Sequence, residues 1–250
     1  MKFSLTFLIQ AFLINLVLCG TLFSQSTFFL DEDEQPVLIY QSEYLHGFGV
    51  EPVYSYAAEE EFEDACEKAL DELNSNLFMS VYIEEFKTND YTTYNFPELS
   101  VRDTVLAFGD TVIKQDSVII NEQAVCVAAL ANKSPGINVE MPSLSRLFIG
   151  PQKIGDTWFA IGKTRATSYN PSVAWMKAKN NALQDLTKAI RISVQSIERQ
   201  LEEGDYTQSG GITYFKSNLI YNGIYNVRRY TTHKSFLTVI AVKESDVIEY

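Results

Sequence analysis

The amino-acid sequence predicts an α+β fold made of two tandem β-α-β-β units, each with one long helix packed on a three-stranded antiparallel sheet. The first observation is an internal similarity: residues 49–85 and 162–198 align without gaps and are identical at 10 of 37 positions. Unrelated chains of ordinary composition agree at roughly one position in fifteen. The second observation is that each stretch precedes two runs rich in β-branched and aromatic residues. The third is length, because 250 residues accommodate two units of a common domain size.

The identical positions show which surface the two stretches share. In the first stretch they are Gly49, Ser55, Tyr56, Ala65, Ala69, Leu70, Leu73, Ser80, Val81 and Glu85, and each has its match in the second stretch at one constant offset. Most of the helical matches are small or apolar residues spaced three or four apart, as on one face of a helix. Ala128 and Ala241 extend the same offset to a late strand. Any amphipathic helix could imitate the helical matches, but the upstream Gly and Ser-Tyr matches favour a duplication.

Residues 1–24 are expected to be a secretory signal peptide. One lysine precedes a long apolar run, and small and polar residues follow it, which is typical of a cleaved export signal. An uncleaved membrane anchor is the alternative, although Gln10 and Asn15 interrupt the run. Cys19 raises the question of lipidation, because bacterial lipoproteins are cut just before a cysteine. Leu18 stands where that cleavage needs a small residue.

Residues 25–38 are predicted to be an extended lead-in tether, and residues 39–130 to form the first unit. A strand is expected at residues 44–54, where β-branched and aromatic residues concentrate. A helix is expected from about residue 58 to 85, since its acidic first turn suits the helix dipole and an apolar stripe follows. Pro97 then interrupts the pattern. Two β-rich runs, predicted to pair as antiparallel strands, complete the unit.

Residues 131–156 are predicted to link the two units, because they contain three prolines. A short strand is expected within this linker at residues 146–149. Residues 157–250 repeat the order of the first unit, starting with a strand. Asn170 is expected to cap the second helix, with the proline after it as the first helical residue. Gly204 is expected to end this helix, and a hairpin with a final strand follows.

The chain is acidic, with 32 Asp and Glu residues against 20 Lys and Arg residues and a formal net charge of −12. Nucleic acid is therefore excluded as a partner, because phosphate binding requires a basic surface. Acidic runs lie at residues 31–34 and 59–64. We interpret the first as part of a solvated tether and the second as a helix start. Neither has the spaced ligands and glycine of a calcium loop, so no metal site is predicted.

No catalytic signature is present, since the sequence has no nucleophile elbow, phosphate loop, Rossmann glycine pattern, HExxH motif or CxxC pair. We therefore predict a protein that is not an enzyme and has no cofactor. Its two histidines, His46 and His233, are far apart in the sequence and are expected at the surface. Cys66 falls on the first helix and Cys126 on the last strand of the same unit. They form either a disulfide, as an exported protein permits, or two buried free thiols.

Aromatic residues make up 13% of the chain, and some are placed where they could contact a ligand. Trp158 and Trp175 are the best candidates for stacking on a ligand, and Tyr221 and Tyr225 lie in a tyrosine-rich hairpin. These four residues are the candidate aromatic binding surface. The alternative is ordinary aromatic packing in the core or on a sheet.

Residues 160–198, followed by a hairpin ending in SFLTVIAV, resemble a domain of the twenty-kilodalton outer-membrane lipoprotein family, which includes components of flagellar outer-membrane rings. The residues that carry the resemblance are Gly162, Asn170, Pro171, Ala174, Ala178, Ala182, Leu186 and Ala241. More faintly, residues 49–130 resemble the same domain. The resemblance implies a dodecin-like β-α-β-β fold and an envelope or secreted assembly protein. It implies no catalytic residues.

These observations predict an exported protein of the cell envelope that binds or assembles with other envelope components without catalysis. It would be periplasmic, associated with the outer membrane, or secreted. Its partners would be other envelope proteins or copies of itself, bound through sheet edges or helix faces. The alternative hypothesis is a carrier of a small planar ligand such as a flavin, because dodecin-like units can enclose such ligands between aromatic side chains.

Overall fold

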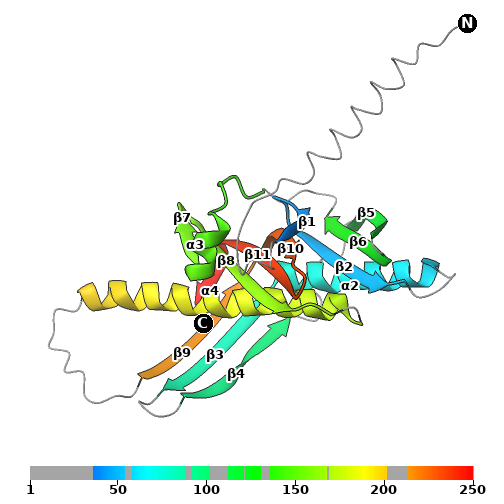
Figure 1. Ribbon diagram of the computed structural model, residues 1–250. Helices are drawn as coiled ribbons and strands as arrows, with labels where there is room; N and C mark the ends of the chain where they lie inside the picture. The colour runs from blue at the N-terminus through cyan, green and yellow to red at the C-terminus, as the bar shows by residue number, and fades with distance from the viewer. Residues whose placement is uncertain are drawn as a thin grey trace, which may run out of the picture.

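The computed structural model describes residues 36–53, 58–87, 92–101, 112–120, 122–130, 136–167, 169–201 and 213–249. These residues form an α+β fold in which helices pack on antiparallel sheets, as the sequence predicts at this coarse level (Figure 1). The expected signal peptide and the tether up to residue 35 lie outside the described residues. None of the described helices is long and apolar enough to cross a membrane.

The first half of the chain builds a three-stranded antiparallel sheet with one helix across it. Its elements are β2 (His46–Pro52), α2 (Ala58–Leu77), β5 (Val112–Ile120) and β6 (Gln123–Leu130). The strand order is β2-β6-β5, and α2 crosses β2 and β6. The helix lies very close to β2 because Gly49 has no side chain. A Cβ atom at Gly49 would stand 1.7 Å from the carbonyl oxygen of Ala65.

The second half contains a similar arrangement within a larger sheet. Its elements are β7 (Gln152–Ile154), β8 (Thr157–Arg165), α4 (Pro171–Leu201), β10 (Tyr225–Thr231) and β11 (Ser235–Lys243). The strand order is β1-β10-β11-β8-β7, where β1 (Val37–Gln41) comes from the start of the described chain. A Cβ atom at Gly162 would stand 1.9 Å from the carbonyl oxygen of Ala178. The Asn170 side chain accepts a hydrogen bond from the Val173 N–H at 3.1 Å, which confirms the predicted helix cap.

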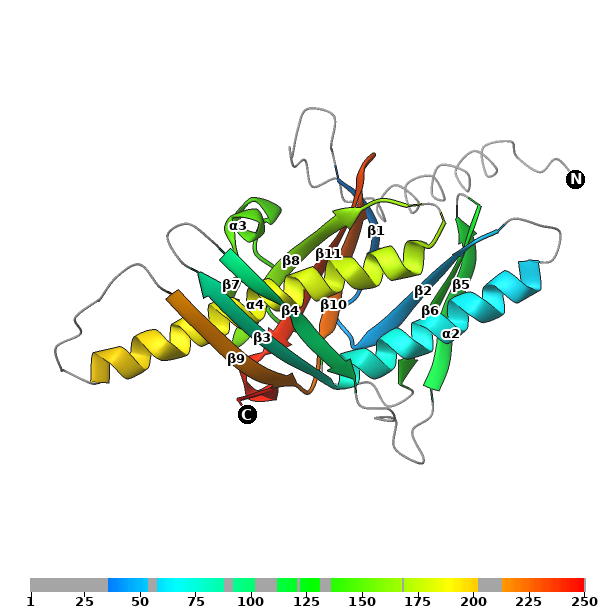
Figure 2. The same ribbon diagram turned by 90° about the horizontal axis from the view of Figure 1, so that it is seen from below.

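A third sheet joins the two halves. Its strands are β3 (Met79–Lys87), β4 (Thr92–Val101), β9 (Thr213–Tyr221) and β12 (Val247–Glu249), which follows a 3-10 turn, η1 (Glu244–Asp246). Their order is β12-β9-β3-β4, so β3 of the first half pairs along its length with β9 of the second half. Figure 2 shows β3, β4 and β9 crossing α4. Apolar residues from both sheets surround α4 in one buried cluster, so α4 lies between two sheets.

The first helix is shorter than the sequence analysis predicts. α2 ends at Leu77, and the residues after it form β3 instead of continuing the helix to residue 85. Met79, Val81 and Ile83 are buried at alternate positions, which is the period of a strand, and they pack in the cluster around α4. The identical residues downstream of α2 therefore lie in a strand in the first half and in a helix in the second half.

Two predictions about connecting segments are wrong. Pro97 lies inside β4, at a place where the register with β3 is irregular. A proline is tolerated there because β4 is an edge strand and needs fewer N–H donors. Residues 146–149 belong to α3 (Leu144–Ile149) instead of a strand, because Leu144 and Leu147 are buried together as one face of a helical turn.

Candidate functional site

β5 and β10 hold corresponding positions in the two halves. Ser117 of β5 faces Cys126 of β6, and Arg229 of β10 faces Thr238 of β11. On their other side, Cys126 and Thr238 each pair with the glycine that the two halves share. Both outer strands also have a register irregularity at the corresponding place, which in β5 falls at residues 114–116. The two hairpins therefore share their order, their pairing register and their irregularity.

The difference in residue number between corresponding positions of the two halves changes by one between the first strand and the last strand of each unit. A comparison without gaps matches Gly49 with Gly162 and Cys126 with Val239. In the sheets, Gly49 faces Cys126, but Gly162 faces Thr238, which is one position before Val239. The predicted constant offset in the last strand is therefore wrong by one position. A sequence comparison without gaps could not detect this shift, because the intervening segments differ in structure.

The outer edge of β10 is covered, whereas that of β5 is open within the described chain. β1 pairs antiparallel with β10 and places Leu38 opposite Tyr230. Just beyond β1, the Ser42 N–H donates to the Val227 carbonyl oxygen at 3.0 Å. β5 is nine residues long, and no described strand pairs with its outer edge. Because an open strand edge offers rows of N–H and C=O groups to an extended segment, this edge is the candidate site.

Two other long edge strands in the described chain offer fewer free backbone donors. At β2, the Phe48 N–H donates to the Glu72 carboxylate at 2.7 Å, and the Val50 N–H donates to the Ser172 hydroxyl at 2.8 Å. The Ser172 hydroxyl in turn donates to the Val50 carbonyl oxygen at 2.6 Å. At β4, Pro97 removes one N–H donor from the edge. β5 therefore differs from both strands in what it can offer to a partner.

A buried ionic cluster connects α2, α4 and β10 near the junction of the two halves. Arg229 is fully buried, and its Nη2 donates to both carboxylate oxygens of Glu72 at 2.6 Å. Lys179 of α4 donates to the Ser75 hydroxyl at 2.5 Å and to the Asn76 side-chain oxygen at 2.9 Å. Burial alone would raise the pKa of Glu72, but the charges of Arg229 and Lys179 and the hydrogen bond from Arg229 hold it below its ordinary value.

His46 belongs to the same cluster and is fully buried, which corrects the expectation of a surface position. The Asn76 amide donates to the His46 carbonyl oxygen at 2.7 Å, and His46 Nδ1 lies 3.0 Å from the Tyr44 carbonyl oxygen. Burial lowers the pKa of His46 to about 4, with the hydrogen bond to Tyr44 opposing the change and Arg229 adding to it. Burial likewise lowers the pKa of Lys179 to about 8, although Glu72 opposes that change. His233 is exposed.

The four aromatic residues of the predicted binding surface are buried instead. Their exposed fractions are 8% for Trp158, 3% for Trp175, 0% for Tyr221 and 4% for Tyr225. The Trp175 ring stacks on Phe236 with 4.5 Å between centroids, and the Arg229 guanidinium lies over the same indole at 5.4 Å. The Tyr221 hydroxyl lies 2.7 Å from the Thr187 hydroxyl inside the core. These rings pack in the interior because the helices and the third sheet cover the faces that carry them.

Cys66 and Cys126 form a disulfide that connects α2 to β6, with their Cα atoms 5.0 Å apart. Of the two outcomes that the sequence leaves open, the structure contains the bonded pair. In the second half, Lys179 takes the place of Cys66 in the helix alignment, and Thr238 takes the place of Cys126 in the strand register. A covalent link in the first half therefore corresponds to part of the ionic cluster in the second.

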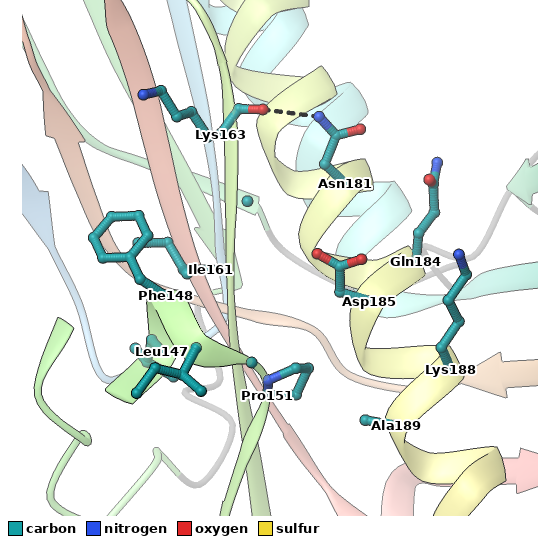
Figure 3. Close-up of a pocket in the computed structure, with 13 residues that line it drawn as sticks. Leu147, Phe148, Pro151, Ile161, Lys163, Asn181, Gln184, Asp185, Lys188 and Ala189 are labelled. Atoms are coloured by element: carbon teal, nitrogen blue, oxygen red, sulfur yellow. Dashed lines mark hydrogen bonds between the residues drawn. The ribbon is translucent and has the colours of Figure 1, made fainter. Parts of the chain in front are cut away.

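The described surface also has a groove of about 740 Å³ between α3 and α4. Figure 3 shows Asn181, Gln184, Asp185 and Lys188 of α4 along one wall and Leu147, Phe148, Pro151 and Ile161 along the other. The Asn181 amide closes one end by donating to the Lys163 carbonyl oxygen at 2.8 Å. Burial raises the pKa of Asp185, while Lys188 opposes this change. The sequence does not predict this groove, because its walls come from three separate segments, namely the predicted linker, the strand after it and the second helix.

The ionic cluster is not predicted from the sequence either, although charged residues on the apolar stripes of both helices indicate it. Glu72 follows Ala69 by three positions, and Asn76 follows Glu72 by four, so both polar residues continue the apolar stripe of α2. Lys179 lies three positions before Ala182 on the stripe of α4. Charged residues on an inward stripe indicate buried partners, but only the tertiary structure shows that these partners come from the other half.

No family model matches the chain, and searches of the curated proteins and of the solved structures find no match. Among the described residues, no group of three or more His, Cys, Asp or Glu side chains could hold a metal ion.

Proposed function

We propose that this chain is an exported, non-catalytic protein of the cell envelope, built from two tandem β-α-β-β units, that assembles with other envelope components through the open edge of β5. The partner would contribute an extended segment that pairs with β5 and enlarges its sheet. We also propose that the chain is related to the outer-membrane lipoprotein family, because the residues around its second helix resemble that family.

The observation that carries the proposal is the difference between two corresponding edges. β5 and β10 share strand order, register and irregularity, yet β10 has β1 on its outer side and β5 has no described strand there. The second half of the chain thus contains an example of the complex that we propose for the first half. The register of β1 on β10, transferred to the corresponding positions of β5, places a partner strand opposite residues 116–119.

Two further features support duplication and export. The Gly49–Ala65 and Gly162–Ala178 contacts bring helix and strand together in the same way in both halves. The Cys66–Cys126 disulfide fits an oxidising compartment outside the cytoplasm, because cytosolic thiols are generally kept reduced. The disulfide agrees with the apolar leader predicted at the start of the chain, whereas the glycine contacts bear only on the duplication.

Strand addition can be tested with the protein's own edge-covering segment. A synthetic peptide of residues 36–42, which contains β1, should bind the purified mature chain and slow amide hydrogen exchange in β5. The same peptide with the change Ile39→Pro is the matched control, because proline removes an N–H and disfavours pairing. Exchange in β5 that stays unchanged at saturating peptide would contradict the proposal. Protection confined to β10 would show exchange with β1 instead of addition to β5.

A second candidate function, carriage of a small planar ligand, is favoured by the groove between α3 and α4. Its volume of about 740 Å³ lies within the range of small-molecule sites, and one wall is apolar. The buried aromatic residues named from the sequence are not part of this groove. A panel of flavins and aromatic acids should raise the melting temperature of the chain if it carries such a ligand, and Ile161→Glu should abolish the shift. No shift with any member of the panel would end this alternative.

A further inference from the structure

We propose that the buried ionic cluster binds a monatomic anion such as chloride, held by Arg229 and by the polar side chains beside it on the sheet. The site lies at the junction of the two halves, where Arg229 of the second half meets Glu72 of the first. It is separate from the edge of β5. The inference therefore goes beyond the proposed function and is tested independently of it.

The cluster contains more buried positive charge than negative charge. Arg229 and Lys179 are both fully buried, and Lys179 stays mostly protonated at pH 7 because its pKa is about 8. In the described chain, Glu72 is the one carboxylate that pairs with Arg229 or acts on Lys179. His46 is neutral at this pH, since its pKa is about 4. Because buried charges are normally paired, one positive charge remains to be balanced.

The hydrogen-bond donors that would hold the anion lie on one face of the β10–β11 pair. Arg229 Nε and Nη1, Thr238 Oγ1 and Asn226 Nδ2 are buried, and none has a hydrogen-bond partner among the described residues. Arg229 faces Thr238 across the two strands, and Asn226 faces Ile240, two residues further along β11. Side chains two positions apart on a strand share a face. Ile240 belongs to the apolar cluster around α4, so all three polar side chains point toward that helix.

The other neighbours of Arg229 leave these donors unused. Its Nη2 donates to both Glu72 oxygens, and the rings of Phe48 and Trp175 lie 4.7 and 5.4 Å from the guanidinium carbon. An aromatic face attracts a cation but is a weak hydrogen-bond acceptor. The unpartnered His46 Nε2 is an acceptor as well, because the Nδ1 of that ring donates to a carbonyl oxygen, so His46 is not a ligand of the anion.

The comparison of the two halves shows why the site belongs to the second half alone. Lys179 and Thr238 take the places of Cys66 and Cys126. The disulfide puts two neutral, bonded atoms between helix and strand in the first half, whereas the second half has a cation and an unpartnered hydroxyl there. An anion bound by Thr238 and attracted by Lys179 would link α4 to β11, as the disulfide links α2 to β6.

The dependence of stability on chloride tests the inference. Urea unfolding of the mature chain should be measured at constant ionic strength while sodium chloride replaces sodium gluconate. Because the folded chain binds the ion and the unfolded chain does not, the ratio of folded to unfolded protein should rise with chloride, by up to about tenfold for each tenfold increase. Crystals grown in sodium bromide should show an anomalous peak beside the Arg229 guanidinium.

Thr238→Val separates an anion ligand from a hydroxyl that is merely unpaired. The variant should raise the chloride concentration needed for half of the effect by about fivefold, since it removes one hydrogen bond to the ion. A hydroxyl without a ligand would instead give a variant that is as stable as the wild type or more stable. Lys179→Met should also weaken the chloride dependence, because it removes the unbalanced charge. The matched control is Ser217→Ala, which removes a buried, unpartnered hydroxyl on β9 and should keep the full dependence.

Three results would overturn the inference. The first is a stability that responds equally to chloride and gluconate. The second is a bromide crystal with water alone beside Arg229, or with an adventitious ion only, whose binding has no effect on stability. The third is a chloride dependence that persists unchanged in both Thr238→Val and Lys179→Met, which would place the ion elsewhere. None of these results bears on strand addition at β5, which is measured by hydrogen exchange in that strand.

Discussion

At the scale of single residues, Gly49 and Gly162 determine how closely each helix approaches its sheet. Both stand where the backbone of a helix rests directly on a strand, with Ala65 and Ala178 as the facing residues. Small residues on both sides remove the space that side chains would normally occupy. The contact is therefore sensitive to the addition of one carbon atom.

Gly162→Ala is expected to lower the free energy of unfolding by about 3 kcal/mol, because the new methyl group would overlap the Ala178 carbonyl oxygen and displace the helix. Gly49→Ala should have a similar effect through Ala65. Urea unfolding at neutral pH measures both changes. A loss below about 1 kcal/mol in either variant would show that the helix can shift at little cost.

His46 should make stability depend on pH in a defined window. Its folded-state pKa is about 4 and its ordinary value is 6.5, so the unfolded chain binds the extra proton between these values. The contribution is present above pH 6.5 and is lost as the pH falls toward 4, for a total of about 3 kcal/mol. Plots of the free energy of unfolding against pH should therefore have different slopes for the wild type and for His46→Phe across this window. Phenylalanine is chosen because Phe159 occupies the matching position of the second half; equal slopes would refute the prediction.

At the scale of elements, α2 and α4 begin at matching positions but end differently. α2 gives way to β3, whereas α4 continues well beyond the corresponding point. Because β3 and β9 then pair with each other, the third sheet depends on this difference in helix length. The disulfide also connects two elements, because it links α2 to β6, the strand on which α2 packs.

Replacing both cysteines, Cys66→Ala with Cys126→Ala, should lower the free energy of unfolding by about 4 kcal/mol, because the bond closes a loop of 60 residues in the unfolded chain. The readout is denaturant unfolding of the double variant beside the wild type. Thiol labelling of the unfolded wild type without reductant serves as the control and should detect no labelling at these two positions. Full labelling there would show free thiols and contradict the structure.

At the scale of the whole molecule, the two halves are held together by shared elements. Pairing of β3 with β9 and the contacts of Arg229 and Lys179 with α2 both cross the boundary between them. The halves are therefore expected to unfold together. Assembly through β5 would leave this junction unchanged, because β5 lies at the far edge of its own sheet.

Export can be examined on the whole protein by expressing the chain in a bacterial host and measuring the intact mass after fractionation of the envelope. We expect a mature chain that begins at Gln25 or Ser26 in the periplasmic or culture fraction, because the leader is expected to end there. A mass beginning at Cys19 with added acyl chains would instead identify a lipoprotein. A full-length mass in the membrane fraction would support an uncleaved anchor.

Features held by local interactions can be predicted from the sequence, whereas features held by contacts between distant segments cannot. The start of α4 could be predicted because Asn170 caps it through a local hydrogen bond. The Gly49 and Gly162 contacts could be anticipated because small residues recur at helical spacing. β3 was missed since no glycine or proline ends α2, although the alternation of Met79, Val81 and Ile83 is a strand pattern.

By itself, the sequence determined the α+β class, the order of most elements and the similarity of the two halves, because these depend on local spacing and capping. Only the tertiary structure decided that β3 pairs with β9, that Glu72 meets Arg229, and that Trp175 lies in the core. The same applies to the open edge of β5, whose counterpart is covered by β1. These features arise from contacts between segments that lie far apart in the chain, where local periodicity carries no information about the partner.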